Sequence, residues 1–181
     1  LTPHVTLNKF ACLEVVSVTN HGAFLDWGLA KDIFVPFSEQ SKKLEVEQHP
    51  IVFLYLDKIT NRLAASCKLN KFLSNENIEL KEKDEVELLI AEKTDIGINV
   101  IINDCYRGIL YQNEIFQTLQ YGSRVRGYIK KIREDNKIDV SLQKSGYENV
   151  QPNEEKILAK LKENNGFLKL NDYSSPEEIT A

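Results

Sequence analysis

The sequence predicts a mainly β fold of two small five-stranded barrels in tandem, followed by an incomplete segment of different character. Three observations predict this fold. Short runs rich in β-branched and aromatic residues alternate with turn residues over most of the chain, the pattern occurs twice, and helical periodicity replaces it after Gln143. The 181 residues are 42% apolar and 28% charged, which is typical of a folded chain rather than a disordered one.

The repeat has a period of 75 residues. When HGAFLDWGLAKDIFVPFSEQ is set above IGINVIINDCYRGILYQNEI, Gly22 falls on Gly97 (97 − 22 = 75) and Glu39 falls on Glu114. Further on, RLAAS (62–66) falls on KIDVS (137–141) at the same offset. Identity is low, but the apolar pattern agrees, so we predict one structural unit used twice. Register inside the fourth strand of the unit is ambiguous.

Each unit reads as five strands separated by turn residues such as NHG, TDIG and EDN. A longer connection follows the third strand, with room for a helical turn. This arrangement favours a Greek-key barrel of the OB type, with a small SH3-like barrel as the alternative. The expected strands are 10–18, 22–29, 32–37, 51–57 and 62–68 in the first unit, and 85–93, 97–103, 106–111, 123–133 and 137–142 in the second.

Strand parity divides the second strand of the first unit into two faces. One face is expected to join the core and carries Ala23, Leu25, Trp27 and Leu29. The other face places Phe24 beside Asp26 and Gly28, which is a poor composition for a core. Two explanations for Phe24 remain open: it lies on an exposed outer face, or it packs under the preceding loop.

After the second unit the sequence becomes helical. NEEKILAKLKENNG (153–166) has early acids, late lysines and a final glycine, which predicts a helix. SSPEE then predicts a second helix start, with Ser175 as its N-cap. The predicted organisation is a first barrel domain at 5–69, a polar linker at 70–83, a second barrel domain at 84–144, and the start of a further domain at 145–181.

Charge is unevenly distributed along the chain. The net charge of −4 argues against strong nonspecific binding to nucleic acid. Residues 71–120 are acidic, with 5 Lys/Arg and 10 Asp/Glu, whereas residues 121–144 hold 7 Lys/Arg against 3 Asp/Glu. This second segment predicts a local basic patch, although each single cation there also fits an ordinary solvated strand face.

Several function classes find no support in the sequence. No apolar run approaches the roughly 18 residues of a membrane span. Cys12, Cys67 and Cys105 are far apart and fit small core side chains better than a disulfide framework or a zinc site. Scattered histidines and the lack of a phosphate-binding glycine loop indicate a protein that is not an enzyme and needs no cofactor. We expect a cytoplasmic location.

Particular segments resemble a known family. GAFLDWG, IFVPFSE and LDKITNRLAAS resemble, in that order, the pattern of S1 RNA-binding domains. Together with IREDNKIDVSLQ and GFLKLNDYSSPEEI, they make nearly the whole chain similar to the conserved virulence factor B family of bacterial S1 proteins. The resemblance implies two S1-like OB barrels followed by the beginning of a winged-helix domain. It further implies an additional S1 domain before Leu1 and the rest of the winged helix beyond Ala181.

The resemblance also implies an RNA-binding face on each barrel. Matched by position, the binding residues of the first unit are His21, Phe24, Pro36, Asp57 and Arg62. Pro36 stands where many S1 domains have a histidine, and His21 stands where an aromatic residue is usual. In the second unit Asn99 replaces Phe24, Tyr111 takes the place of Pro36, and Arg107 and Lys137 lie nearby.

Stacking and charge explain how these residue types hold RNA. A base stacks on an aromatic ring with about 1–3 kcal/mol, and lysine and arginine follow the phosphates. Phe24 and Tyr111 are the candidate stacking residues, although Tyr111 also fits an amphipathic residue covering a barrel end. The candidate phosphate ligands are Arg62, Arg107, Arg124, Arg126, Lys130 and Lys137.

Two functions therefore remain open at this point. The first is a protein that holds single-stranded RNA on its barrel faces, in post-transcriptional or virulence-type gene regulation. The second is a scaffold, associated with the ribosome or with an RNase, whose barrels bind protein instead. Pro36, Asn99 and the net charge of −4 favour the second function, while the S1-like positions and the basic segment favour the first.

Overall fold

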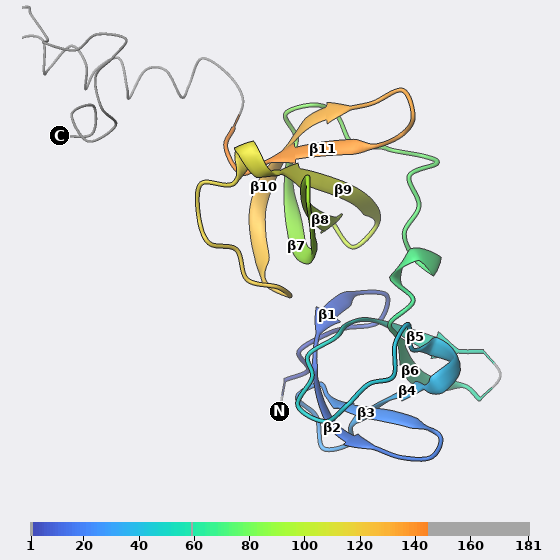
Figure 1. Cartoon of the computed structure of the whole chain (residues 1–181). Coiled ribbons are helices and arrows are strands. Elements are labelled where there is room, and N and C mark those ends of the chain that lie inside the picture. Colours follow the sequence, from blue (N-terminus) through green and yellow to red (C-terminus); the bar gives the residue numbers. More distant parts are fainter. Residues whose placement is uncertain (1, 59, 145–181) are drawn as a thin grey trace, which may run out of the picture. The chain divides into compact units, whose positions relative to one another are not determined.

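A computed structural model describes residues 2–58 and 60–144 (Figure 1). In the first unit six strands form two three-stranded sheets, β1-β5-β6 and β2-β3-β4. Their bounds are β1 (Phe10–Cys12), β2 (Glu14–Val18), β3 (Gly22–Asp26), β4 (Ile33–Pro36), β5 (Ile51–Asp57) and β6 (Arg62–Ser66). β1 and β2 are two parts of the expected strand 10–18, which bends at Leu13 so that one part pairs with β5 and the other with β3.

The second unit is a closed five-stranded barrel with the order β10-β11-β9-β8-β7. The pairs are antiparallel except β11 with β9, which is parallel. This order, with the third and fifth strands parallel, is the OB topology that the sequence predicts. Figure 1 shows these strands curling around one another. Their bounds are β7 (Glu85–Thr94), β8 (Gly97–Ile102), β9 (Tyr106–Tyr111), β10 (Arg124–Ile132) and β11 (Ile138–Ser141).

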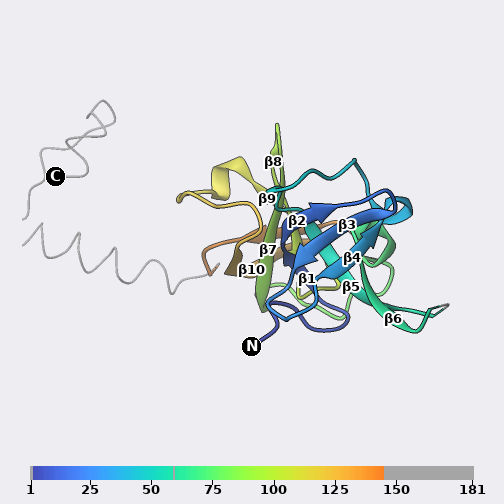
Figure 2. The same cartoon turned by 90° about the horizontal axis from the view of Figure 1, so that it is seen from below.

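The mainly β fold class and the OB barrel are thus confirmed. All ten expected strands are present, with ends that differ from the expected ones by a few residues. A short 3₁₀ turn follows β4 in the first unit and β9 in the second, at η1 (Phe37–Glu39) and η3 (Gln112–Glu114). Figure 2 shows β2, β3 and β4 of the first unit side by side.

Equivalent positions of the two units fill the two barrel cores. Val35 and Leu110 are fully buried, as are Leu54 and Ile129, and in each pair the residues are 75 apart. Alternation along each strand directs these side chains inward, as expected. The shared offset therefore reflects a shared core.

The expected core face of β3 holds only in part. Ala23 and Leu25 are buried, but β3 ends at Asp26, so alternation does not continue to Leu29, which is half-buried. Trp27 is half-buried and packs against the core, and its Nε1 donates a hydrogen bond to the Lys31 carbonyl at 2.6 Å. Asp26 ends the strand by accepting a hydrogen bond from the Gly28 amide at 2.8 Å.

The same polar contact is present in both barrels. Ser66 Oγ donates to Glu39 at 2.6 Å, and Ser141 Oγ donates to Glu114 at 2.7 Å. Each carboxylate also pairs with a lysine, Lys71 for Glu39 and Lys130 for Glu114. These contacts tie the 3₁₀ turn to the end of the last strand, so the repeat preserves a bracing network as well as a core.

A third apolar cluster joins the two barrels. It combines Phe10, Ile51 and Phe53 of the first unit with Leu89 and Ile101 of the second. Beside it, Asp104 accepts hydrogen bonds from the Phe10 amide at 3.0 Å and from Arg124 Nη2 at 2.7 Å. Residues 1–143 accordingly form one compact unit.

The cysteines differ from one another in exposure. Cys67 is buried, Cys12 is half-buried and Cys105 is exposed, so the expectation of a core side chain is wrong for Cys105. Burial raises the pKa of the Cys67 thiol to about 11. The expected helix at 153–166, the N-cap at Ser175 and the winged-helix segment 145–181 lie outside the described residues.

Candidate functional site

The outer face of the first barrel is aromatic where β3 meets β4. Phe24 and Phe34 are opposite each other across the two strands, with ring centroids 5.0 Å apart and planes inclined by 43°. Both rings are half-buried and lie on the side opposite the core residues Ala23 and Leu25. Phe24 therefore lies on the outer face and packs sideways on Phe34.

The other expected residues of this barrel are divided between its two sheets. Pro36 is opposite Gly22 on the next rung, and the exposed His21 precedes that rung. Asp57 and Arg62 are opposite each other at the turn end of the β5–β6 hairpin, where Arg62 is exposed. Asp57 accepts a hydrogen bond from the Thr60 hydroxyl at 2.6 Å. The first unit thus offers flat apolar rings, with one exposed arginine at the hairpin.

The second barrel presents a different chemistry on its β9–β11 side. Arg133 Nη2 donates to the Tyr111 hydroxyl at 2.6 Å, and Arg133 Nε donates to Asp139 Oδ2 at 3.0 Å. The guanidinium carbon lies 5.6 Å from the centroid of the tyrosine ring, within cation–π range. The hydrogen bond and charge of Asp139 raise the pKa of Arg133. This network fixes an arginine and a tyrosine in one orientation.

The carboxylate beneath this network is buried. Asp139 is 7% exposed, and its Oδ1 makes no hydrogen bond within the described part of the chain. Its position in the first barrel is occupied by the small Ala64, since Lys131 is opposite Asp139 as Tyr55 is opposite Ala64. The two barrels therefore share a frame but differ in the polarity of this face.

A hollow of about 810 Å³ opens on the same side of the second barrel. Its size suits one or a few nucleobases or a small organic ligand. Tyr111, Arg107 and Lys137, which the sequence predicts as binding residues, all line it. Further polar side chains around it come from Asn70, Ser74, Asn75, Glu76, Asn99, Arg133, Asp135 and Asn136.

Arg133 is the residue that the sequence alignment of the two units missed. In β10 the register against β11 shifts by one residue between Ile129 and Lys131, which is a β-bulge. The offset between the units is 75 up to Leu54 and Ile129, and becomes 76 beyond the bulge. Arg133 therefore occupies the place of Asp57. The ambiguity of the fourth strand was the only sequence signal of this shift.

The remaining predicted cations lie elsewhere and are paired. Arg124 contacts Asp104, Glu87 and the Phe10 carbonyl at the junction of the barrels. Burial lowers the pKa of Arg124, but Asp104 and Glu87 raise it overall. On β10, Arg126 pairs with Glu85 at 3.1 Å, and Lys130 pairs with Glu114. These three residues do not line the hollow that contains Tyr111.

In residues 2–58 and 60–144 no group of three His, Cys, Asp or Glu side chains is arranged to hold a metal ion. The same part of the chain contains no helix with the length and apolarity needed to cross a membrane.

Comparison with known proteins confirms the resemblance that the sequence indicates. Residues 9–68 match the S1 domain family, and residues 155–181 match the CvfB-like winged helix domain family. The first match covers the first barrel, so this barrel is an S1 domain. The second match falls on the segment expected to begin a winged helix.

Relatives align over nearly the whole chain at low identity. Protein YitL of Bacillus subtilis is 27% identical over 188 residues, which cover 98% of this chain and 62% of the relative. Conserved virulence factor B of Staphylococcus epidermidis is 22% identical over 184 residues, with the same two coverages. The chain thus spans a little under two thirds of the length of the curated relatives that it matches.

Among solved structures, a multidomain protein with nucleic acid binding domains from Streptococcus pneumoniae matches at a TM-score of 0.46. It is 21% identical, and the match covers 99% of this chain and 67% of that one.

Proposed function

We propose that this chain, which carries an S1 domain at residues 9–68, is a nucleic-acid-binding protein that holds single-stranded RNA. The observation that carries the proposal is the hollow on the second barrel, where Tyr111, Arg107, Arg133 and Lys137 come together on one face. The role is one of binding rather than catalysis. The relation to conserved virulence factor B supports extending the proposal to post-transcriptional regulation.

The contacts of these residues suit an unpaired strand. A base that is free of a duplex can stack on the Tyr111 ring, and every base has a face that allows this. Arg133 is already oriented by Asp139 and Tyr111, so little side-chain freedom is lost when it meets a phosphate or a base edge. Arg107 and Lys137 are exposed and can follow the backbone phosphates.

The first barrel adds a less polar surface in this proposal. Phe24 and Phe34 together offer a second stacking platform, while Arg62 supplies a phosphate contact at the hairpin. His21 and Pro36 border this platform, while Asp57 lies opposite Arg62 on the β5–β6 hairpin. Stacking on aromatic rings is possible for every base, which favours tolerance of base identity. In this proposal the first barrel accepts any base, whereas the second barrel is more selective for base identity.

Fluorescence anisotropy with labelled homopolymer RNAs at two salt concentrations tests the proposal. We expect micromolar or tighter binding that weakens as salt rises, because cations contact phosphates. Tyr111→Ala is expected to weaken binding by about 1–3 kcal/mol, the contribution of one stacked base. Phe116→Ala is the matched control, since that ring is 69% exposed on the same barrel but lies outside the hollow.

Two results would oppose the proposal. Unchanged RNA binding in a Phe24→Ala, Tyr111→Ala double variant would show that bases do not stack on these two rings. Equal affinity for DNA and RNA of one sequence would support nucleic-acid binding but contradict a preference for RNA. The 2′-hydroxyl is the group that distinguishes the two.

One observation favours the alternative of a protein-binding scaffold. Leu56 and Leu63 are opposite each other on the β5–β6 hairpin, and they are 44% and 40% exposed. An exposed apolar pair on adjacent strands fits a protein contact better than a phosphate backbone. A partner that is retained after exhaustive RNase treatment and lost in a Leu56→Ser, Leu63→Ser variant would support this alternative.

A further inference from the structure

The segment between the barrels packs on the second barrel through Asn75. Its Nδ2 donates to the carbonyls of Arg107, at 2.9 Å, and Asn136, at 2.8 Å. Its Oδ1 accepts a hydrogen bond from the Arg107 amide at 2.9 Å. One side chain thereby connects the start of β9 to the turn between β10 and β11. The linker is therefore part of the folded surface rather than a loose tether.

The same segment holds the side chain of Arg107. Arg107 Nη1 donates to Asn70 Oδ1 at 3.2 Å, and Nη2 donates to the Leu73 carbonyl at 3.4 Å. Both acceptors are neutral, and within the described ranges no carboxylate forms an ion pair with this guanidinium. Arg107 is thus an oriented, exposed cation whose charge is available to a ligand.

Arg107 lies at the meeting point of two hollows. The hollow that contains Tyr111 and a second one of about 780 Å³ share Asn70, Leu73, Asn99, Arg107 and Gly108. The second hollow extends to Lys68 and Ser41 of the first barrel. Because they share five residues, the two hollows form one groove, which we call the linker groove.

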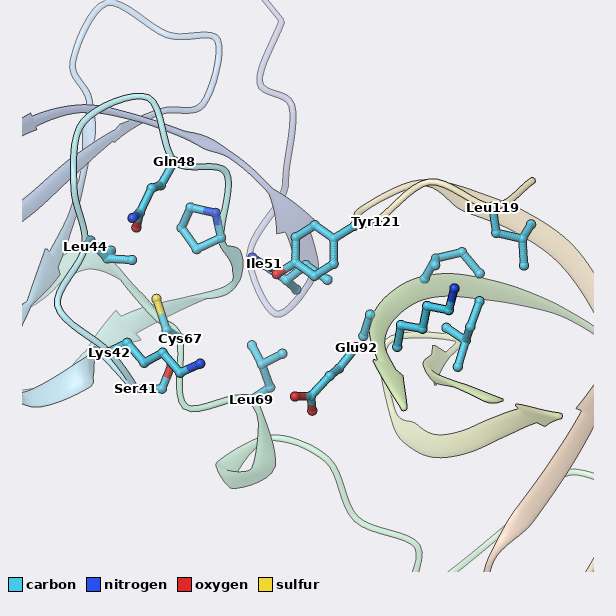
Figure 3. A pocket seen from close by; sticks show the side chains of 15 residues that line it. Ser41, Lys42, Leu44, Gln48, Ile51, Cys67, Leu69, Glu92, Leu119 and Tyr121 are labelled. Atoms are coloured by element: carbon cyan, nitrogen blue, oxygen red, sulfur yellow. Dashed lines mark hydrogen bonds between the residues drawn. The ribbon is translucent and has the colours of Figure 1, made fainter. Parts of the chain in front are cut away.

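A third hollow continues the linker groove beyond Ser41. Its volume is about 620 Å³, and it shares Ser41, Cys67, Leu69, Ala91 and Glu92 with the second hollow. Figure 3 shows Lys42 and Glu92 pointing toward each other, with Tyr121 next to Ile51 on another side of the hollow. The hydroxyl of Tyr121 accepts a hydrogen bond from the Ile51 amide at 3.1 Å, which fixes that side.

The charges along the linker groove favour a polyanion. Lys42, Lys68 and Lys93 line it in addition to Arg107, and no carboxylate in the described part of the chain pairs with any of the three lysines. The acids that line the three hollows are Glu76, Glu92 and Asp135. Asp135 pairs with Lys137 at 2.8 Å, and Lys71 pairs with Glu39 at 2.6 Å. Cations spaced along a groove, with neutral amides between them, match the repeating phosphates of a single strand.

We propose that one RNA strand runs from the Tyr111 hollow through the linker groove, so that the linker and the first barrel's Lys68 and Lys42 form a second segment of the binding site. This inference rests on the proposed function and deepens it. The apolar cluster and the Asp104–Arg124 contact join the barrels beside the groove, so the path exists before RNA binds. The strand is then longer than a single barrel face requires.

Comparing a short and a long oligonucleotide tests the path. A uridine oligomer of about 4 nucleotides covers one barrel face, while one of about 12 nucleotides also reaches the groove. We expect the longer oligomer to bind more tightly to the unaltered chain. The Lys42→Gln, Lys68→Gln variant is expected to weaken the longer oligomer about tenfold and to leave the shorter one unchanged. For the longer oligomer, the slope of log K against log salt concentration should become shallower by about 1.4 in this variant, because two phosphate contacts are lost.

The control is a Lys31→Gln, Lys81→Gln variant, which removes the same charge from two exposed lysines outside the three hollows. It should bind both oligomers as the unaltered chain does. A photoreactive uridine at the end of the longer oligomer provides a second measurement. We expect it to crosslink within residues 67–75 or 41–50.

The outcomes separate the two proposals. If both oligomers bind equally and Tyr111→Ala weakens both, the path through the groove is wrong and the proposed function stands. If the control variant weakens the longer oligomer as much as the groove variant, general charge and not the path explains the affinity. If neither oligomer binds, the proposed function itself fails. If a protein partner binds and protects the crosslinking peptides, the groove serves that partner instead.

Discussion

Asp104→Asn should destabilise the joined barrels, because Asp104 is the buried acceptor at their junction. Its side chain is 4% exposed and receives hydrogen bonds or ion pairs from the Phe10 amide, Arg124 and Lys9. The residue has φ of 56°, a left-handed conformation that asparagine tolerates. The substitution therefore removes the charge while keeping shape and backbone.

The magnitude follows from the exposure of the partners. Removing one member of a buried ion pair costs about 3–5 kcal/mol. Here Arg124 is 32% exposed and keeps Glu87, while Lys9 is 52% exposed, so solvent compensates part of the loss. We therefore expect a loss of about 2 kcal/mol, near the value of a hydrogen bond to a charged group. Urea unfolding at neutral pH measures it.

Stability as a function of pH gives a second measurement. Burial alone would raise the pKa of Asp104, but hydrogen bonds from Arg124, the Phe10 amide and Lys9 lower it overall. A lowered pKa contributes stability above the unfolded value of about 3.9 and loses it as the pH falls through the folded value. The difference in free energy of unfolding between the unaltered chain and Asp104→Asn should thus be largest at neutral pH and shrink in acid.

Glu85→Gln is the control for this prediction. Glu85 is the exposed partner of Arg126, with side-chain exposures of 53% and 74%, so its loss should cost less than about 1 kcal/mol. If Asp104→Asn cost no more than Glu85→Gln, or if its effect did not depend on pH, the reasoning on the junction would be refuted.

Three further predictions concern the repeated frame and the thiols. Ser66→Ala and Ser141→Ala should each cost about 1 kcal/mol, since each hydroxyl binds a glutamate and one backbone amide; clearly unequal losses in urea unfolding would contradict an equivalent role. Gly22→Ala should cost about 1–3 kcal/mol in thermal unfolding, because a Cβ there would clash with the Val35 carbonyl; unchanged stability would mean that β3 and β4 can separate locally. Iodoacetamide near neutral pH should alkylate the exposed Cys105 and spare Cys67, whose pKa burial raises to about 11; equal labelling by mass spectrometry would contradict the burial.

The strands could be predicted from the sequence because their signals are local. Alternation of apolar residues identifies the faces, and turn residues such as Asn61 and Asn136, which have positive φ, mark the hairpins. The repeat adds a second copy of each signal. Parity placed Phe24 on the outer face for the same reason, although only the structure shows that Phe34 covers part of its ring.

Contacts between distant segments could not be predicted in this way. Asp104 binds the amide of Phe10 across 94 residues, and nothing near either residue indicates it. Arg124, expected among the phosphate ligands, lies in that junction because it completes the charge pair there. Asn75 reads as an ordinary linker residue in the sequence, yet it holds Arg107 in the fold. Such contacts depend on how the barrels pack.

The β-bulge in β10 has a consequence for how such barrels can diverge. The residue at the last rung of the hairpin is Asp57 in one copy and Arg133 in the other, and the one-residue shift decides which side chain takes that place. At the unshifted offset of 75 that place would belong to Ile132, so a single inserted codon can exchange a neutral side chain for a charged one at one point of a surface. The core residues Leu54 and Ile129 keep equivalent partners. Gene duplication followed by a change in length, rather than by substitution, offers a short route from a neutral platform to a cationic one.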